Sequence, residues 1–301
     1  MSGIVECVPN FSEGKDPGVI KLIADAITSV KGISLLGIDA DSDHNRTVVT
    51  FVGDPQAVLE ASFRAVEKAA ELIDIRKHSG VHPRIGATDV VPFVPLVGVT
   101  MDDCVELSRR LGRMVGEELG IPVFLYAESA RLPGKRRLAD IRRGGYEKLV
   151  KEIGKTPIKT PDYGPCKVHP TAGAVAVGAR KILVAFNVYL DTKDVRVARE
   201  IAKSIRESDG GLPSVQALGL YLPEKGAVQV SMNLLDFERT SIHAVMERVK
   251  EEASRLGVEV LSSEIVGLVP LRAVVETAAF YLRAPGLKTH KILEEMMFYT
   301  A

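Results

Sequence analysis

The chain lacks a net charge, a long hydrophobic run and a secretory start. Its 39 Lys and Arg residues balance its 39 Asp and Glu residues, so no global basic field favours nucleic acid as the main partner. No apolar run approaches the roughly 18 residues of a membrane span. The first residues have neither the basic start nor the long apolar core of a signal peptide. We therefore expect a cytoplasmic protein.

Cysteine is also scarce, with Cys7, Cys104 and Cys166 scattered over 301 residues. An odd and widely spaced set argues against a disulfide framework and against a CxxC metal site. Cys166 beside Lys167 lies in an expected loop without an obvious base, where a thiol is more often inert than reactive. By contrast, apolar residues make up 46% of the chain, which is enough for a sizeable core.

The order of predicted elements, β-α-β-β-α-β, occurs twice. Helical spacing of apolar residues and starts such as Asp54-Pro55 mark the helices. The first set lies at 3–10, 16–30, 33–40, 46–53, 54–73 and 89–96, and the second at 181–190, 194–207, 213–222, 227–235, 240–256 and 258–261. This is the ferredoxin-like order. We predict an α+β fold with two such subdomains, 1–180 and 181–301, and a ligand crevice between them lined by 164–179.

The loop "RKHSGVHPRIGATDVVPFVP" (76–95) raises a choice between a metal site and a proton-transfer site. His78 and His82 are four apart, a spacing that presents two metal ligands on a helix. Here Gly80 separates them and Pro83 moves His82 out of helical backbone. A third ligand would have to come from the segment 39–44. The loop therefore favours proton transfer, although a metal hydrolase built on His44, His78 and His82 stays open as an alternative.

The neighbours of His82 favour a catalytic role over a solvated loop histidine. Arg84 follows a proline, Gly86 permits close backbone approach, and Asp89 comes next. An imidazole, a guanidinium and a carboxylate on one rigid loop can move a proton and hold an anion. Histidine is the side chain best matched to proton transfer near neutral pH.

Three further polar segments each have a structural and a functional interpretation. In "DADSDHNRT" (39–47), an acidic turn explains much, but Asn45 and Arg46 suit ligand binding. In "PNFSEG" (9–14), a helix-capping loop competes with donors and acceptors from Asn10 and Ser12. The segment 130–145 is expected to be a solvated surface with local pairing, or an acceptor for a polyanionic tail. Its basic residues are Arg131, Lys135, Arg136, Arg137, Arg142 and Arg143.

Six motifs together resemble the glutamate formiminotransferase family, whose unit also forms the N-terminal part of formiminotransferase-cyclodeaminase. They are "VECVPNFSEG", "NRTVVTFVG", "HSGVHPRIGATDVVPFVPL", "GARKILVAFNVYL", "NLLDFE" and "IVGLVPLRAV". The resemblance implies a one-carbon transferase of histidine degradation that moves the formimino group of N-formimino-L-glutamate to tetrahydrofolate. It also implies a homodimer and folate in a tunnel between the subdomains, and a cyclodeaminase for the next step, if present, is expected to be a separate protein.

The family resemblance assigns roles by position. His82 stands in the family's His-Pro-Arg motif as the catalytic histidine. We expect Asp39 to orient it or to pair with the amidinium, Arg46 and Arg84 to hold the donor's carboxylates, and no metal to be required. The folate segment is implied to comprise Gly164, Pro165, Cys166, Lys167, Val168, His169, Pro170, Thr171, Ala172 and Gly173. Gly86, Asn10, Ser12 and Asn45 complete the predicted site.

One departure from the family pattern leaves alternatives open. Thr171-Ala172-Gly173 stands where Ser-Trp-Gly is frequent, so stacking on the pterin is expected to be weaker or the pocket wider. Three other functions therefore stay open: a formyl- or formimino-transferase that uses glycine or another amine donor, a non-catalytic folate-binding protein, and the metal hydrolase described above.

Overall fold

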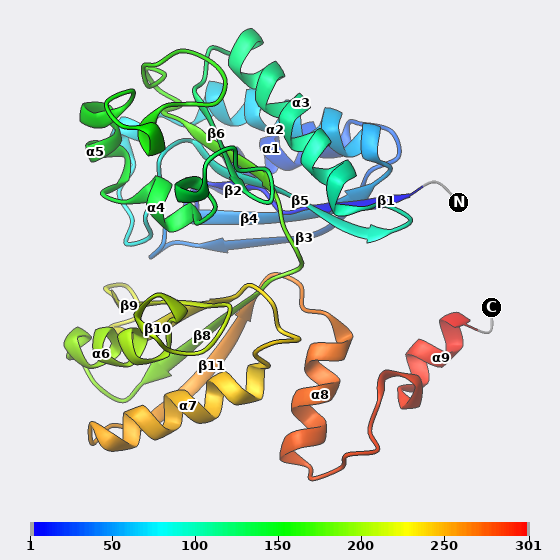
Figure 1. Cartoon of the computed structure of the whole chain (residues 1–301), viewed down its shortest axis with the longest axis vertical. Coiled ribbons are helices and arrows are strands. Elements are labelled where there is room, and N and C mark those ends of the chain that lie inside the picture. The colour runs from blue at the N-terminus through cyan, green and yellow to red at the C-terminus, as the bar shows by residue number, and fades with distance from the viewer. Residues whose placement is uncertain (1–2, 300–301) are drawn as a thin grey trace. The chain divides into compact units, whose positions relative to one another are not determined.

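The computed structural model describes residues 3–299, and side chains over 3–297. The chain forms two compact units, residues 1–181 and 182–301, which are described separately (Figure 1). Both combine a sheet with helices, which confirms the mixed α+β class. No helix of the described part is long and apolar enough to span a membrane.

The first unit is built on a seven-stranded sheet. β1 and β2 share one position between β4 and β5, and β3 pairs with the outer side of β4. β7 lies between β5 and β6 and runs parallel to both. The strands are β1 (Ile4–Cys7), β2 (Asn10–Phe11), β3 (Ser34–Asp41), β4 (Arg46–Gly53), β5 (Thr88–Val97), β6 (Val123–Ala127) and β7 (Val175–Ala179).

Helices cover this sheet and begin where the sequence predicts. Asp16 and Asp54 each accept hydrogen bonds from the first turn of their helix, and a proline follows each cap. α1 (Pro17–Thr28), α2 (Pro55–Leu72) and α3 (Met101–Glu118) bury a main core against one sheet face, whereas α4 (Leu138–Arg142) and α5 (Gly145–Glu152) enclose a smaller core with Val90, Phe124 and Tyr126. The predicted starts of α1 and α2 are thus confirmed.

The region 97–180 departs from the predicted order of elements. β6 and β7 extend the sheet beyond the first six elements, and α3 precedes β6 in the chain. Residues 164–179, which we expected to lie between the two halves, belong to the first unit, because β7 is inserted between β5 and β6. The run "AGAVAVGA" is buried throughout and apolar, as is typical of a parallel strand covered on both faces.

The second unit is a four-stranded antiparallel sheet in the order β11-β8-β10-β9, with elements in the order β-α-β-β-α-β. Its elements are β8 (Val184–Leu190), α6 (Val195–Ile205), β9 (Val215–Leu222), β10 (Ala227–Leu234), α7 (Ile242–Arg255) and β11 (Val260–Val266), followed by α8 (Leu271–Tyr281) and α9 (Leu293–Tyr299). Short 3-10 helices lie at Ile75–Lys77, Pro133–Lys135, Pro157–Lys159, Glu207–Asp209 and Thr289–Lys291.

Candidate active site

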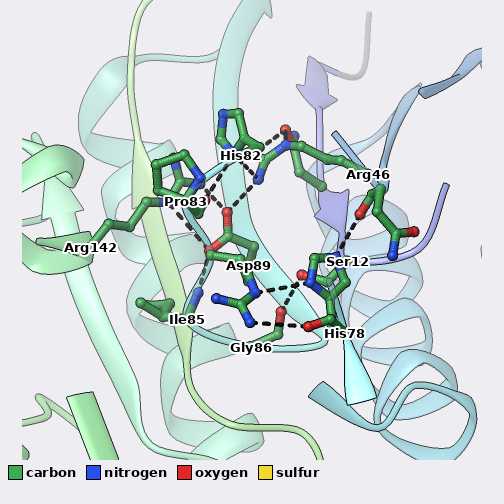
Figure 2. A network of polar contacts seen from close by, with 12 residues as sticks. Ser12, Arg46, His78, His82, Pro83, Ile85, Gly86, Asp89 and Arg142 are labelled. Carbon is green, nitrogen blue, oxygen red and sulfur yellow. Dashed lines mark hydrogen bonds and ion pairs between the residues drawn. The ribbon is translucent and has the colours of Figure 1, made fainter. Parts of the chain in front are cut away.

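Asp89 is the buried centre of a polar cluster in the first unit, shown in Figure 2. Phe11 pairs with Thr88 and Asn10 with Val90, so Asp89 is the extra residue of a β-bulge in β5. Bulges commonly redirect a side chain beside an active site. The Asp89 carboxylate is fully buried and accepts a hydrogen bond from the Ile85 backbone N–H at 3.0 Å. The bulge thus delivers one negative charge into the interior.

Two arginines neutralise that carboxylate. Arg46 at the start of β4 donates from Nη1 to Asp89 Oδ2 at 2.6 Å. Arg142 in α4 donates from Nε to Oδ1 at 3.3 Å and also bonds Oδ2 through Nη2. Burial would raise the pKa of Asp89, but Arg142 and Arg46 together hold the pKa below its ordinary value. The cluster therefore carries one negative and two positive charges at neutral pH.

Arg46 is held on its other side by Asn10. Its Nε and Nη2 donate to Asn10 Oδ1 at 2.9 and 2.6 Å, and Asn10 Nδ2 donates to the Val8 carbonyl at 2.8 Å. Burial lowers the pKa of Arg46 to about 10, so the guanidinium stays protonated at neutral pH. The three nitrogens of the Arg46 guanidinium all bond to Asn10 or Asp89, which gives Arg46 a positioning role in this structure.

His82 lies against this positive cluster. Its Nδ1 is 2.8 Å from the Pro83 carbonyl oxygen and 3.1 Å from Arg46 Nη1. Because a carbonyl only accepts, we assign the hydrogen to Nδ1 and the lone pair to Nε2. Within the described residues Nε2 has no hydrogen-bond partner. Burial, then Arg46, Arg142 and His44, lower the pKa of His82 well below 6.5. The imidazole is therefore neutral at pH 7, and Nε2 can accept a proton.

His78 has a different environment from His82. Its Nε2 is 2.8 Å from the Asn45 carbonyl oxygen, and its Nδ1 accepts from Arg84 Nε at 2.9 Å. Both ring nitrogens are thus engaged in the neutral form, and burial lowers the pKa of His78. In residues 3–297, no three His, Cys, Asp or Glu side chains are arranged to hold a metal ion. The geometry makes His78 a tether for the loop.

Arg84 is also committed to protein partners. Besides His78, it pairs with Glu147 in α5, at 2.7 Å from Nη2 and 3.1 Å from Nη1. Only 14% of its side chain is exposed. This arrangement fixes the loop after His82 and leaves little of the guanidinium for a substrate carboxylate.

Asn45 and Ser12 join the loops around the cluster. Asn45 adopts a left-handed backbone conformation with φ of 46°, which asparagine tolerates better than most residues. Its side chain accepts from the Gly14 backbone N–H and donates to the Ser79 carbonyl, both at 2.9 Å. Ser12 is buried and donates from Oγ to the Gly86 carbonyl at 2.7 Å. Both residues hold the site's backbone in place.

Within the described chain, Asp39 takes no part in the hydrogen bonds of His82. It is exposed on the edge strand β3, and no hydrogen bond joins it to His82 among the described residues. The register pairs Asp39 with Val48 and Asp41 with Arg46, so Asp39 and Arg46 share one sheet face. The carbonyl of Pro83, rather than Asp39, orients the His82 ring in this structure.

The segment 164–173 divides into an exposed and a buried part. Gly164, Pro165, Cys166, Lys167 and Pro170 are exposed, whereas Ala172 and Gly173 are buried. His169 Nδ1 accepts from the backbone N–H groups of Thr171 and Ala172, at 3.3 and 3.0 Å. The Ala172 side chain belongs to the main core. It therefore packs inside the first unit.

Gly86 joins the loop that carries His82 to this segment. It forms a bridge with Gly173, and a Cβ at Gly86 would lie 2.0 Å from the Ala174 carbonyl oxygen. We expect Gly86→Ala to lower the free energy of unfolding by about 1–3 kcal/mol, because the backbone must move apart. Denaturant unfolding measures this. Gly18→Ala is the matched control, since its Cβ meets only the Asp16 side chain at 3.1 Å. Equal stability of both variants would contradict this close packing.

Sequence reasoning did not single out three members of the cluster as site residues. Asp89 was grouped with His82 and Arg84 as the carboxylate of their loop but was not predicted as a site residue, and Arg142 was grouped with the basic segment. His44, whose ring centroid is 5.7 Å from that of His82, was considered only as a metal ligand. Asp89 lies at a bulge, which interrupts the alternation of a strand and leaves no periodic signal in the sequence. Arg142 lies among other basic residues, so the sequence does not distinguish it from them. The proline after His82 was the one local signal of a rigid loop.

The remainder of the basic segment pairs locally. Lys135 is buried against Asp162 at 2.8 Å, Arg136 pairs with Glu128 at 3.3 Å, and Arg137 and Arg143 lie near Asp140 at 3.9 and 2.5 Å. With Arg142 bound to Asp89, five of the six basic residues have an acidic partner. The structure supports local pairing over a continuous rail for a polyanionic tail.

Comparison with known proteins gives matches over nearly the whole chain. The family model described as the N-terminal subdomain of the formiminotransferase domain matches residues 4–180, and the formiminotransferase domain matches 185–297. The chain is 46% identical to a glutamate formimidoyltransferase of Streptococcus pyogenes over 98% of both chains. It is 47% identical to one of Thermoplasma acidophilum, covering 98% of this chain and 97% of that protein.

A longer relative has the same unit as part of its chain. The formimidoyltransferase-cyclodeaminase of Rattus norvegicus is 48% identical over 93% of this chain and 53% of its own length. Matches to both subdomain models, together with relatives of equal length at this identity, establish the assignment: the chain belongs to the formiminotransferase family.

Proposed function

We propose that the chain is a glutamate formimidoyltransferase, which transfers the formimino group of N-formimino-L-glutamate to N5 of tetrahydrofolate. Family membership and the names of its full-length relatives support a one-carbon transferase with a folate co-substrate. The observation that carries the mechanism is the neutral His82 imidazole, held through Nδ1 with Nε2 left to act on a proton.

The reaction needs one proton acceptor and one proton donor. N5 of tetrahydrofolate attacks the amidine carbon of the donor and forms a tetrahedral intermediate in which N5 carries an extra proton. His82 Nε2 accepts that proton. The imidazolium then donates it to the glutamate nitrogen, the bond between this nitrogen and the former amidine carbon breaks, and glutamate leaves. One imidazole thus serves as general base and general acid.

The surrounding charges suit both halves of this shuttle. Burial first, and then Arg46 and Arg142, disfavour the imidazolium, so His82 rests in the base form. The same positive charges make the transient imidazolium a strong acid, which favours proton delivery to the leaving nitrogen. Asp89 keeps the two arginines in place.

Several finer features belong to the proposal. Both units are taken as ferredoxin-like subdomains, with boundaries at 1–180 and 181–301, a folate tunnel between them, and a homodimeric state. Asp39 is proposed to pair with the donor's amidinium, since a carboxylate attracts that cation. The exposed part of 164–170 is proposed to contact the folate. Arg46 and Arg84 are assigned to positioning, because their forks are occupied by protein groups.

A direct assay tests the proposed reaction. Purified chain is incubated with tetrahydrofolate and either N-formimino-L-glutamate or N-formiminoglycine, and both products are followed by mass spectrometry. We expect catalytic turnover with the glutamate donor and much slower turnover with the glycine donor. No turnover with either donor would contradict the transferase. Faster turnover with N-formiminoglycine would mean that the donor is the glycine derivative and not the glutamate derivative.

Hydrogen exchange tests the proposed folate site. Tetrahydrofolate is expected to slow exchange in 82–86 and 164–173 together, because the Gly86–Gly173 bridge joins the two loops. The turn 223–226 serves as the internal control and should not change. Protection of only one of the two loops would contradict a shared folate site.

A further inference from the structure

A groove of about 480 Å³ on the outer side of α3 is rich in arginine. We call it the α3 groove. Its lining comprises Glu106, Arg109, Arg110, Arg113, Met114, Arg131 and Tyr163. Among the described residues, none of these takes part in the hydrogen bonds of the His82 cluster. The groove is therefore a separate feature of the first unit.

Close backbone packing fixes one wall of the groove. A Cβ at Gly112 would lie 2.8 Å from a ring carbon of Tyr163, and one at Gly116 would lie 2.6 Å from the Gly164 nitrogen. Because these two glycines, four residues apart on α3, have no side chains, the segment that carries Tyr163 can pack closely against the helix. The carbonyl of Tyr163 accepts from the Val123 N–H at 3.0 Å, which anchors it to the sheet.

The phenol ring of Tyr163 holds the Arg131 side chain in one position. The Arg131 guanidinium lies over the Tyr163 ring, with its central carbon 4.6 Å from the ring centroid. Its Nη2 donates to the Tyr163 hydroxyl at 2.6 Å. Stacking and the hydrogen bond hold the guanidinium without cancelling its charge.

The positive charge of the groove is poorly compensated. Arg109 lies 4.0 Å from Glu106, the acidic residue of the lining. Arg110 donates to the neutral Gln56 amide at 2.8 Å. Within residues 3–297, no acidic side chain pairs with Arg110, Arg113 or Arg131. This differs from the segment 131–143, where nearly every basic residue has a carboxylate partner.

We propose that the α3 groove binds an extended anion that carries several phosphate or carboxylate groups. All four cations are arginines, whose planar fork matches phosphate and carboxylate oxygens in pairs. An open groove suits a flexible chain of charges, since each group can meet a different guanidinium. Because the chain as a whole has no net charge, this local excess gives the anion a specific place to bind.

Calorimetric titration of the full chain tests this site with two probes, inorganic triphosphate and a pentaglutamate peptide. We expect saturable binding of at least one probe at about 0.01 M salt and its loss at about 1 M salt, where charges are screened within roughly 3 Å. Binding of triphosphate alone assigns an oligophosphate ligand, and binding of the peptide alone assigns a polycarboxylate. Binding of neither probe overturns the proposal.

Matched variants locate the binding. The double variant Arg110→Gln, Arg113→Gln should weaken binding by about tenfold or more, because two charge-assisted contacts are lost. Glu106→Gln should tighten it, since the lining loses its acidic group. Arg136→Gln with Arg137→Gln, two exposed arginines paired with acids, should leave the affinity unchanged. Equal weakening in this control, or no effect of the groove variants, would place the binding elsewhere and overturn the proposal.

Discussion

Replacing His82 by alanine is expected to lower kcat by about 10²–10⁴, the usual range for a lost acid–base group. The variant cannot accept the N5 proton or return it to the leaving nitrogen. Folate binding should change little, because the hydrogen bond of His82 is made to the Pro83 carbonyl within the protein. Single-turnover and steady-state kinetics with both substrates, together with an equilibrium folate titration, measure the two effects separately.

His78→Ala is the control for this prediction. His78 tethers Asn45 and Arg84 and should affect kcat much less than His82. Because the pKa of His82 is well below 6.5, wild-type kcat should be flat around neutral pH and fall only as pH drops below the ordinary histidine range. Equal losses of kcat in both variants would favour a purely structural loop or a metal site over a single proton shuttle.

Arg142→Met is expected to lower the free energy of unfolding by about 3–5 kcal/mol, the range for breaking a buried ion pair. The change leaves the fully buried Asp89 carboxylate with one arginine instead of two. Arg143→Met is the matched control, because the Arg143 side chain is 73% exposed and pairs with Asp140 at the surface. Such surface pairs contribute roughly 0–1 kcal/mol. Denaturant unfolding of both variants makes the comparison.

The stability lost in Arg142→Met should depend on pH, and the loss should become smaller in acid. Since the folded state depresses the pKa of Asp89, the ionised carboxylate contributes stability above the unfolded-state value of about 3.9 and loses it as pH falls below that value. The gap between wild type and Arg142→Met should therefore narrow below about pH 4. A gap that stays constant from pH 7 to pH 3 would contradict the ion-pair origin.

Arg142→Met should also change catalysis through His82. Removing a nearby positive charge raises the pKa of His82, so the acidic limb of the kcat profile should move to higher pH. Arg142→Lys, which keeps a positive charge, should restore much of that shift, and Arg143→Met should not move the limb. A purely structural role of Arg142 would lower stability without moving the pH profile.

Local signals in the sequence predicted much of the fold. Asp16 and Asp54 before prolines marked helix starts, and β4 occupies the predicted range 46–53. These features depend on neighbours a few residues apart, so a single sequence carries them. The additional strands β6 and β7 escaped the prediction, because "VFLYA" and "AGAVAVGA" are uniformly apolar and have no alternating pattern.

The sequence by itself determined the family motifs and the rigid His-Pro-Arg loop, and it led to the hypothesis that His82 is the proton-transfer group. Only the tertiary structure decided that Asp89 lies at a bulge, that Arg142 and Arg46 neutralise it, and that Ala172 belongs to the core. Asp89 is 43 residues from Arg46 and 53 from Arg142. Contacts over such separations depend on how strands pair and helices dock, and a buried charge is stabilised only when the fold brings its partners within hydrogen-bond distance.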